Sequence, residues 1–145
     1  MKKEMYFRPD TIQQKSQRML DALASHRSRH SDIVFQPERA ALLVLDVQEY
    51  FLRETSHAFV PSAPAILPNI QSLIRIFYAH NRPVIFTHHA NTDGDAGMMS
   101  SWWRELIRVE SPDSAVIASL DASNGIIIPK TQYDAFHNTS LEGVL

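Results

Sequence analysis

The chain of 145 residues contains no cysteine. This absence excludes disulfides, thiolate metal sites and a thiol nucleophile within these residues. The chain also lacks an apolar run of the roughly 18 to 20 residues that a membrane-spanning helix needs. Its first residues, MKKEMYFRPD, lead into a polar segment rather than the apolar core of a signal peptide. We therefore predict a cytoplasmic protein that does not contact a membrane.

A large excess of charge is missing as well. The sequence has 14 lysines and arginines against 16 acidic side chains, a formal net charge of -2, so no broad basic face is available for nucleic acid or anionic lipid. A small molecule or a protein is the favoured partner. Apolar residues make up 44% and charged residues 21%, which is usual for a globular protein. A chain of this length suits one domain that buries roughly 70% of the surface exposed by its unfolded form.

The first part of the chain predicts a helical arm. Residues 10–26 form a weakly amphipathic helical pattern with Asp10 as the expected N-cap. The apolar positions of that pattern are Ile12, Met19, Leu20 and Leu23. Residues 25–32, SHRSRHSD, are polar and basic, as expected of a solvated connector or of a segment that covers a partner subunit. We take residues 1–34 as an N-terminal arm and connector, and residues 35–145 as the domain.

Three short apolar segments predict the strands of a sheet. Residues 41–47, ALLVLDV, form an almost uninterrupted apolar run, as expected of a strand that helices cover on both faces. Residues 84–89, VIFTHH, and residues 125–130, GIIIPK, are typical of a second and a third strand. Strands that alternate with helices predict an α/β fold with a parallel sheet.

Helical segments separate and follow these strands. Residues 66–80 predict a helix that ends at His80 and Asn81 and whose apolar stripe consists of Ile66, Ile70, Leu73, Ile74 and Phe77. Residues 98–109 predict a further helix, and residues 138–145 predict the start of another, capped by Thr139 or Asn138. Because three strands and a short final helix are fewer than an α/β sheet usually has, we expect the chain to be incomplete at its C-terminal end.

Polar side chains lie where each predicted strand ends. Asp46 ends the first strand, Thr87 lies near the end of the second, and Lys130 ends the third. Ligands bind at the carboxyl ends of parallel strands, so Asp46 and Lys130 would face each other if their strands are neighbours. A partly buried carboxylate is costly alone, whereas an adjacent ammonium favours its charged form. The alternative is that Asp46 caps a turn and Lys130 reaches solvent.

Three segments, ALLVLDVQEYFL, PVIFTHH and PKTQYDAFHNTSLEGVL, resemble the isochorismatase-like hydrolases, which include isochorismatases, nicotinamidases and related amidohydrolases. The resemblance covers about residues 35–145. The combination of a strand-ending D-x-Q with K-x-x-Y-x-A-F-x-x-T-x-L is much more specific than either motif alone. The resemblance implies a Rossmann-like, three-layer α/β/α domain with a mainly parallel sheet and no cofactor.

The resemblance also implies a catalytic trio of Asp, Lys and Cys. The first two fall on Asp46 and Lys130, and the cysteine would lie on a strand-to-helix turn beyond residue 145. The implied role of Asp46 is that of general base toward the thiol and then of acid toward the leaving amine. Lys130 would hold the carboxylate and stabilise developing negative charge. The substrate would be a small amide or a related carbonyl compound.

Two alternatives stay open. In the isochorismatase branch, which the lead-in FQPERAALLVLDVQEYF resembles, the matching Asp protonates a vinyl ether and water completes the release of pyruvate. That branch has a carboxylate-binding arginine after the second strand, where this sequence has Ala96 or Gly97, and Arg104 follows about two helical turns later. The other alternative is a catalytically inactive binding or assembly module with the same fold.

The candidate substrate-binding residues are Gln48, Phe51, Thr87, His89, Trp103, Tyr133 and Phe136. Gln48 either donates a hydrogen bond to a substrate carbonyl or makes a local cap. The aromatic side chains either wall a pocket or belong to the core, and for Phe136 the core is favoured. Trp102 and Trp103 are adjacent on the predicted helix, so one should face inward and the other outward.

A metal site is not predicted. His57, His88 and His89 are the candidate ligands, but adjacent histidines on a strand point to opposite faces and do not enter one site. The loop of residues 91–97, NTDGDAG, lacks the spacing and the terminal glutamate of a calcium loop, and we interpret it as a mobile lid or a plain loop. Oligomers are common in the resembled family, so the arm and the outward tryptophan favour a homo-oligomer.

Overall fold

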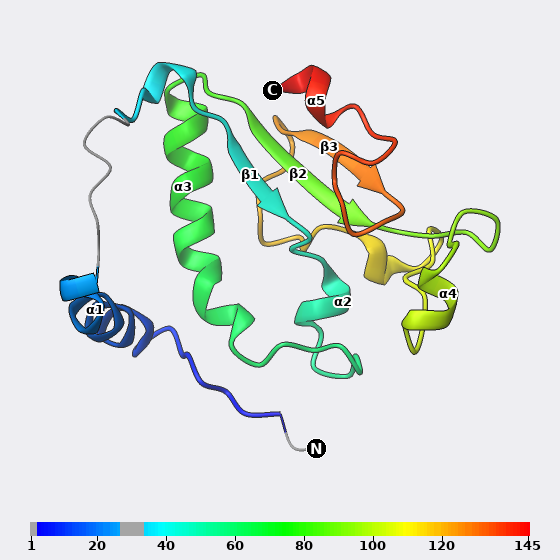
Figure 1. Cartoon of the computed structure of the whole chain (residues 1–145), viewed down its shortest axis with the longest axis horizontal. Helices are drawn as coiled ribbons and strands as arrows, with labels where there is room; N and C mark the ends of the chain where they lie inside the picture. Colours follow the sequence, from blue (N-terminus) through cyan, green and yellow to red (C-terminus); the bar gives the residue numbers. More distant parts are fainter. Residues whose placement is uncertain (1–2, 27–33) are drawn as a thin grey trace.

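A parallel sheet forms the centre of the molecule in the computed structural model, which describes residues 3–26 and 34–145. Its three strands are β1 (Leu42–Leu45), β2 (Val84–His89) and β3 (Ile126–Lys130), with β2 in the middle. Both strand pairs are parallel (Figure 1). The predicted α/β fold with a parallel sheet is therefore confirmed, and β2 has the bounds that the sequence indicates.

The remaining elements are helices and single 3-10 turns. In chain order they are α1 (Ile12–Ala22), η1 (Ala24–His26), η2 (Pro37–Arg39), α2 (Glu49–Leu52), η3 (Ala63–Ile66), α3 (Leu67–Ala79), α4 (Met99–Trp102), η4 (Pro112–Ser114) and α5 (Leu141–Val144). The longest are α1 with 11 residues and α3 with 13. Within the described part of the chain, no helix has the length and apolar character needed to cross a membrane.

Helix α3 packs on one face of the sheet. Its residue Ile74 joins a buried cluster with Val44, Val84, Phe86 and Leu120. The helix ends as predicted, because His80 caps it and Asn81 takes a left-handed φ of 51°. The predicted apolar stripe is partly wrong, since Leu73 and Ile66 are exposed. Leu73 lies about 100° around the helix from Ile74, which turns its side chain away from the sheet.

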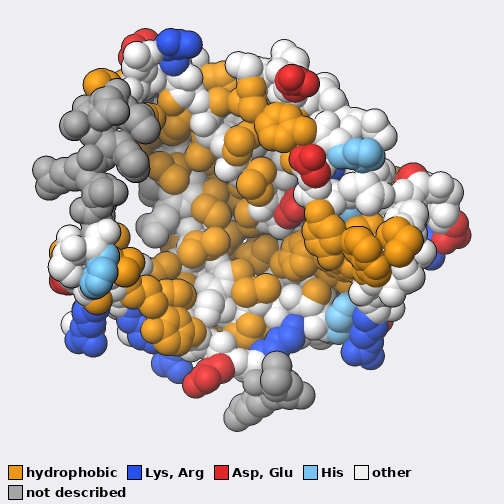
Figure 2. Space-filling model, viewed as in Figure 1, with side chains coloured by type: hydrophobic (Ala, Val, Ile, Leu, Met, Phe, Trp, Pro, Cys, Tyr) orange, Lys and Arg blue, Asp and Glu red, His pale blue; other side chains and the backbone are white. Residues whose placement is uncertain are grey.

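Helix α5 packs on the other face. Its residue Leu141 joins a second buried cluster with Ile85 and Ile128. That helix does not reach β1, where Leu43 and Leu45 are 38% and 56% exposed. The expectation that helices cover β1 on both faces is therefore wrong for this chain. Figure 2 shows the resulting hydrophobic surface over the middle of the molecule, where Figure 1 places the sheet.

The predicted helix over residues 98–109 is wrong beyond Trp102. Trp103 takes an extended backbone, with φ -94° and ψ 144°. The physical reason is a long-range bridge, in which the N–H of Asn91 donates to the carbonyl of Ile107 at 2.7 Å and the N–H of Val109 donates to the carbonyl of Asn91 at 3.2 Å. These hydrogen bonds hold the segment in an extended conformation.

Two predicted helix caps are also wrong. The N-cap of α1 is Thr11 rather than Asp10. The N-cap of α5 is Ser140 rather than Thr139 or Asn138. The Thr139 hydroxyl nevertheless accepts a hydrogen bond from the first helical N–H at 3.2 Å. The chain has already turned at Asn138, which has a left-handed φ of 53°.

The N-terminal arm is attached through its first residues. The Lys3 ammonium donates to the carbonyls of His57 and Phe59, and the N–H of Phe7 donates to the Ser62 hydroxyl at 3.0 Å. Helix α1 itself buries none of its residues. The predicted connector falls largely on residues 27–33, which lie outside the described residues.

Candidate active site

Asp46 follows directly after β1 and has a left-handed backbone, with φ 53°. Side chains alternate along a strand, so regular geometry would turn Asp46 to the α3 face that Val44 shares. The positive φ breaks this alternation and directs the carboxylate to the other face, where Thr87 lies. Aspartate is one of the few non-glycine residues that adopt this conformation, because its short side chain bonds locally.

The carboxylate of Asp46 meets the ammonium of Lys130. Nζ of Lys130 lies 2.9 Å from Oδ2 of Asp46, and the exposed fractions of the two side chains are 4% and 31%. The ammonium also donates to the carbonyl of Gln132 at 3.1 Å. The two strands are not neighbours, because β2 lies between them. The long lysine side chain crosses β2 to reach Asp46. The sequence-based expectation that the pair forms only if the two strands are neighbours is therefore wrong.

Thr87 holds the second carboxylate oxygen. Its hydroxyl donates to Oδ1 of Asp46 at 2.7 Å, and its side chain is fully buried. Each oxygen of the Asp46 carboxylate thus has its own donor, one neutral and one charged. A carboxylate held in this way and still exposed to solvent is suited to exchange a proton with a small molecule.

A model of the isochorismatase domain matches residues 40–145, which include both members of this pair. The chain belongs to the isochorismatase family. The family predicted from the sequence is therefore confirmed.

Three similar proteins show how much of a family member the chain covers. A solved cysteine hydrolase from Pseudomonas syringae pv. phaseolicola is 33% identical, with a TM-score of 0.71, over 77% of this chain and 55% of that protein. Enterobactin synthase component B from Escherichia coli is 30% identical over 79% of this chain and 41% of its own length. A probable isochorismatase from Pseudomonas chlororaphis is 31% identical over 72% and 51%. The chain thus spans about half the length of these isochorismatase-family relatives.

The amide of Gln48, the Gln of the family-like D-x-Q motif, bonds to the backbone. Its Nε2 donates to the carbonyls of His89 and Ser114 at 2.9 and 2.8 Å. Its Oε1 accepts the N–H of His89 at 2.8 Å, and the residue is fully buried. The side chain makes no capping hydrogen bond at α2, so the predicted local cap does not form, and the amide instead bonds to backbone groups far along the chain. Gln48 joins the end of β2 to η4.

An aromatic wall lies beside His89. We use this name for Tyr50, Phe51, Trp103 and Tyr133. The indole of Trp103 stacks on the His89 ring at 5.8 Å with an interplanar angle of 11°, and on the Tyr50 ring at 6.0 Å and 28°. Its Nε1 donates to the Tyr133 hydroxyl at 2.5 Å, and the ring of Phe51 lies edge-on at 6.2 Å. His89 is paired in the sheet with Lys130, so this wall adjoins the Asp–Lys pair.

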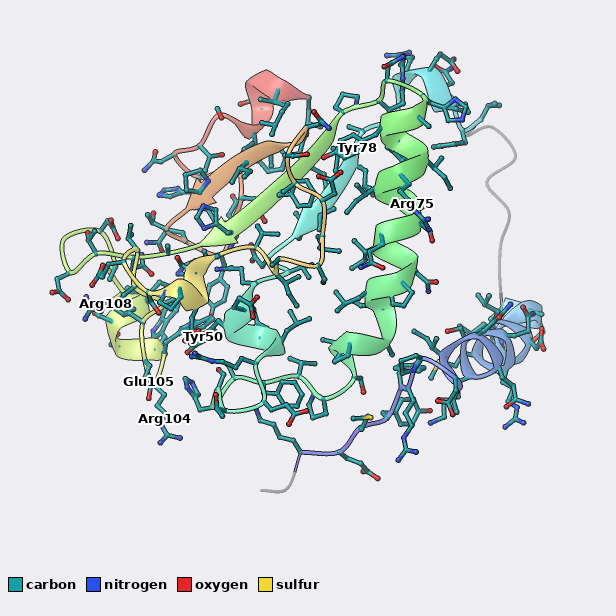
Figure 3. The ribbon with its side chains drawn as sticks, turned by 180° about the vertical axis from the view of Figure 1, so that it is seen from behind. Tyr50, Arg75, Tyr78, Arg104, Glu105 and Arg108 are labelled. Carbon is teal, nitrogen blue, oxygen red and sulfur yellow. The ribbon has the colours of Figure 1, made fainter. Side chains whose placement is uncertain are left out.

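The two tryptophans face opposite directions, as predicted. Trp102 is 65% exposed, whereas Trp103 is half-buried in the wall. Tyr50 was not among the predicted site residues, although it is buried and its hydroxyl donates to the carbonyl of Glu105 at 3.3 Å (Figure 3). Burial raises the pKa of its phenol above the usual value. Its position beside Phe51 on one helical turn is the sequence signal that could have indicated it.

Two predicted aromatic residues are largely exposed. Tyr133 is 62% exposed and lies at the rim of the wall. Phe136 is 53% exposed, so the core interpretation of this residue is wrong. After β3 the chain runs through turns, in which the N–H of Phe136 bonds to the Asp134 carboxylate at 2.9 Å. Those turns direct the phenyl ring away from both core clusters.

The three candidate histidines have separate partners. His57 contacts the Tyr50 hydroxyl at 3.3 Å, Nδ1 of His88 lies 3.1 Å from the Ser114 carbonyl, and Nε2 of His89 lies 2.6 Å from Oδ1 of Asn91. Among the residues that the structure describes, no group of three His, Asp, Glu or Cys side chains has the arrangement to hold a metal ion. These histidines instead bind protein groups on different elements.

The loop of residues 91–97 is closed by its own hydrogen bonds. Both carboxylate oxygens of Asp95 accept hydrogen bonds, Oδ1 from the N–H of Thr92 and Oδ2 from its hydroxyl. Bonds from Asn91 and Thr92 hold the pKa of the Asp95 carboxyl below its usual value. Arg104 is exposed and points away from the body of the molecule (Figure 3), where it lines a hollow of about 450 Å³ beside Trp103.

Proposed function

We propose that this chain supplies the acid–base pair of a hydrolase that cleaves a small amide or a related carbonyl compound. The observation that carries the proposal is the contact of 2.9 Å between the Asp46 carboxylate and the Lys130 ammonium at the carboxyl ends of the strands. The aromatic wall beside the pair supports a small, flat substrate. The solved cysteine hydrolase, 33% identical over 77% of this chain, supports the reaction class.

The roles of the two residues follow from their charges. Asp46 accepts the proton of the attacking nucleophile and returns it to the leaving amine when the C–N bond breaks. Lys130 holds the carboxylate in place through their ion pair and faces the negative charge that develops on the carbonyl oxygen. The net reaction consumes one water and yields a carboxylic acid and ammonia or an amine. In the cysteine hydrolases that this chain resembles, a thiol attacks first and water cleaves the thioester.

A second candidate is the hydrolysis of a vinyl ether. One observation favours it: the chain is 31% identical to a probable isochorismatase over 72% of its length. Asp46 would protonate the vinyl carbon, water would add to the resulting cation, and the C–O bond would break to give pyruvate and an alcohol. Against it, Ala96 and Gly97 carry no charge, and Arg104 is exposed and points away from the body of the molecule (Figure 3).

One experiment separates these reactions. The protein is expressed from its complete reading frame and assayed for ammonia released from nicotinamide and for pyruvate released from isochorismate. We expect ammonia, and we expect Asp46→Asn to lower its release by about 100-fold or more. Asp21→Asn is the matched control, because Asp21 is exposed on α1.

Each outcome of this assay has one meaning. Pyruvate without ammonia replaces the first reaction by the second. Neither product, from a protein that folds, favours the binding or assembly module. Unchanged ammonia release in Asp46→Asn removes the carboxylate from the mechanism.

The location and assembly predicted from the sequence belong to the same proposal. We place the protein in the cytoplasm as a homo-oligomer that binds a small molecule. Support for the oligomer comes from α1, which buries none of its residues, and from Trp102, which is 65% exposed. Sedimentation of the full-length protein tests the assembly.

A further inference from the structure

We infer that Asn91 and Asp95 are positioning residues for the aromatic wall, and that they act through His89 to fix the plane of Trp103. The inference rests on the proposed function in one respect, because it takes Trp103 as the surface on which a flat substrate lies. Neither residue touches Asp46 or Lys130 among the hydrogen bonds and ion pairs of the described chain.

The hydrogen bonds of Asn91 define which way its amide points. Its Nδ2 donates to Oδ1 of Asp95 at 2.9 Å and to the carbonyl of Thr131 at 3.1 Å. Because both of these partners are acceptors, the nitrogen must face them and the amide oxygen must face the other way. Oδ1 of Asn91 therefore lies against Nε2 of His89, at 2.6 Å. The residue is fully buried, so water does not compete for these bonds.

This contact determines the state of the His89 ring. An amide oxygen only accepts hydrogen bonds, so His89 carries a proton on Nε2. Burial lowers the pKa of the imidazole, and the nearby Lys130 ammonium acts in the same direction, while the Asn91 bond and the Asp46 carboxylate oppose it. The proton on Nε2 is thus held by Asn91, and this bond fixes the plane of the His89 ring. Its face stacks on Trp103 within 11° of parallel.

The backbone of Asn91 also positions Trp103 indirectly, through the segment that follows it. Its N–H and carbonyl bond to Ile107 and Val109, in the segment that follows Trp103. The indole is therefore fixed by the ring beneath it, by the backbone after it and by the Tyr133 hydroxyl at its edge. Among the hydrogen bonds of the described residues, the Asp95 carboxylate bonds to Asn91 and Thr92 and to no residue of the wall. A change of this carboxylate therefore alters the network without removing a contact of the wall.

The consequence is selectivity for flat substrates. A fixed indole face favours a planar ring that stacks on it over an aliphatic group of similar size. Loosening the network should weaken the binding of a flat amide and leave an aliphatic amide unaffected. The proton transfer by Asp46 should not change, because its partners Thr87 and Lys130 are untouched.

The test uses Trp103 as its own reporter. Residues 1–145 contain two tryptophans, so Trp102→Phe, together with Phe at any tryptophan outside these residues, leaves Trp103 as the only tryptophan. We expect Asp95→Ala to shift its emission to longer wavelength and to increase quenching by acrylamide. Asp95→Asn keeps an oxygen for the Asn91 amide and should restore both readouts. Asp93→Ala is the matched control, because that neighbouring carboxylate forms an ion pair with Arg108 instead.

A ligand measurement completes the test. Nicotinamide serves as the flat amide and acetamide as the aliphatic one, each titrated by calorimetry. We expect Asp95→Ala to weaken nicotinamide binding about tenfold and to leave acetamide binding unchanged. The emission readout needs no substrate, so it tests the positioning role even if the proposed hydrolysis fails.

The opposite results are equally clear. Emission and quenching that match the parent in Asp95→Ala, or an equal shift in Asp93→Ala, would overturn the inference. Asp95 is exposed, so its replacement should leave the fold intact. If Asp95→Ala nevertheless loses its circular dichroism, His89→Gln is used in its place. That variant keeps a donor for Asn91 but removes the stacked ring, and an unshifted emission again refutes the role of the network.

Discussion

Thr87 and Asp46 exchange two hydrogen bonds. The Thr87 hydroxyl donates to Oδ1 of Asp46 at 2.7 Å and accepts the backbone N–H of Asp46 at 3.2 Å. The two residues are 41 positions apart in the sequence, with Asp46 directly after β1 and Thr87 on β2. The orientation of the carboxylate is therefore set by β2 and not only by the turn that carries it.

The first prediction concerns this hydroxyl. Thr87→Val keeps the shape of the side chain and removes both hydrogen bonds, so we expect the free energy of unfolding to fall by about 1 kcal/mol. Thr87→Ser keeps the hydroxyl and serves as the control, with the smaller loss expected from a missing methyl group. Urea titrations measure both. A larger loss in Thr87→Ser than in Thr87→Val would mean that packing, and not the hydrogen bond, is what Thr87 contributes.

The second prediction is an asymmetry between the members of the ion pair. Lys130 has 4% of its side chain exposed and Asp46 has 31%. Asp46→Asn leaves an ammonium buried without its counter-charge, which costs about 3 to 5 kcal/mol. Lys130→Met leaves a carboxylate that water and Thr87 still reach, which costs about 1 kcal/mol. Chemical denaturation of the two variants compares these costs, and equal losses would contradict the burial difference.

The third prediction follows from the φ of 53° at Asp46. Both Asp46→Gly and Asp46→Ala remove the carboxylate, so both lose the ion pair. Glycine adopts the left-handed conformation freely, whereas a Cβ there costs about 1 to 2 kcal/mol. We expect Asp46→Gly to be the more stable of the two by about that difference. Thermal unfolding of the pair is sufficient, and a more stable Asp46→Ala would show that the strand end relaxes.

The fourth prediction concerns the buried amide of Gln48. Gln48→Leu leaves the backbone N–H and carbonyl of His89 and the carbonyl of Ser114 without this partner. A buried group left without a hydrogen bond costs about 1 to 3 kcal/mol, so we expect a total loss of at least about 2 kcal/mol. Gln71→Leu is the control, because the half-buried Gln71 makes one side-chain hydrogen bond, to the Ser119 carbonyl. Similar losses in both variants would contradict a bracing role for Gln48.

The fifth prediction concerns pH. Burial lowers the pKa of His89 in the folded protein below its ordinary value of 6.5. As the pH falls through that value, His89 in the unfolded chain binds a proton more readily than His89 in the folded protein. The free energy of unfolding therefore falls as the pH falls. We expect His89→Gln to reduce this slope between about pH 7 and pH 5. Asp95 titrates below 3.8 and lies outside this window. An unchanged slope would mean that His89 gains its proton equally in both states.

Local patterns were sufficient to predict the framework of the fold. Pro83 cannot continue the preceding helix, and the apolar run that follows it predicted a strand with the bounds Val84–His89 without any tertiary information. Asp46 and Lys130 could be paired because the carboxyl ends of parallel strands share one edge. That geometric rule does not depend on the order of the strands, which explains why the pair forms across β2.

Apart from this pair, contacts between distant segments could not be predicted. Helical spacing runs over residues 98–109, but α4 ends at Trp102, and at Ile107 and Val109 the backbone bonds to Asn91 instead of forming helical hydrogen bonds. The same residue connects His89 to Asp95, and no local motif indicates that role. The exposure of Leu45 depends on what packs against β1, which a strand pattern does not contain. Burial and side-chain partners are properties of the assembled chain.

The register of β2 has a consequence for folding. A slip by one residue against β1 would bring His88 to the place of Thr87 and turn the threonine toward α3. The same slip would move His89 away from its partner Lys130 on β3. Misaligned chains would therefore lose the Thr87 hydroxyl at Asp46 and the His89 ring beside Lys130 together. The register of β2 therefore determines both the pairing of the sheet and the position of the side chains beside Asp46.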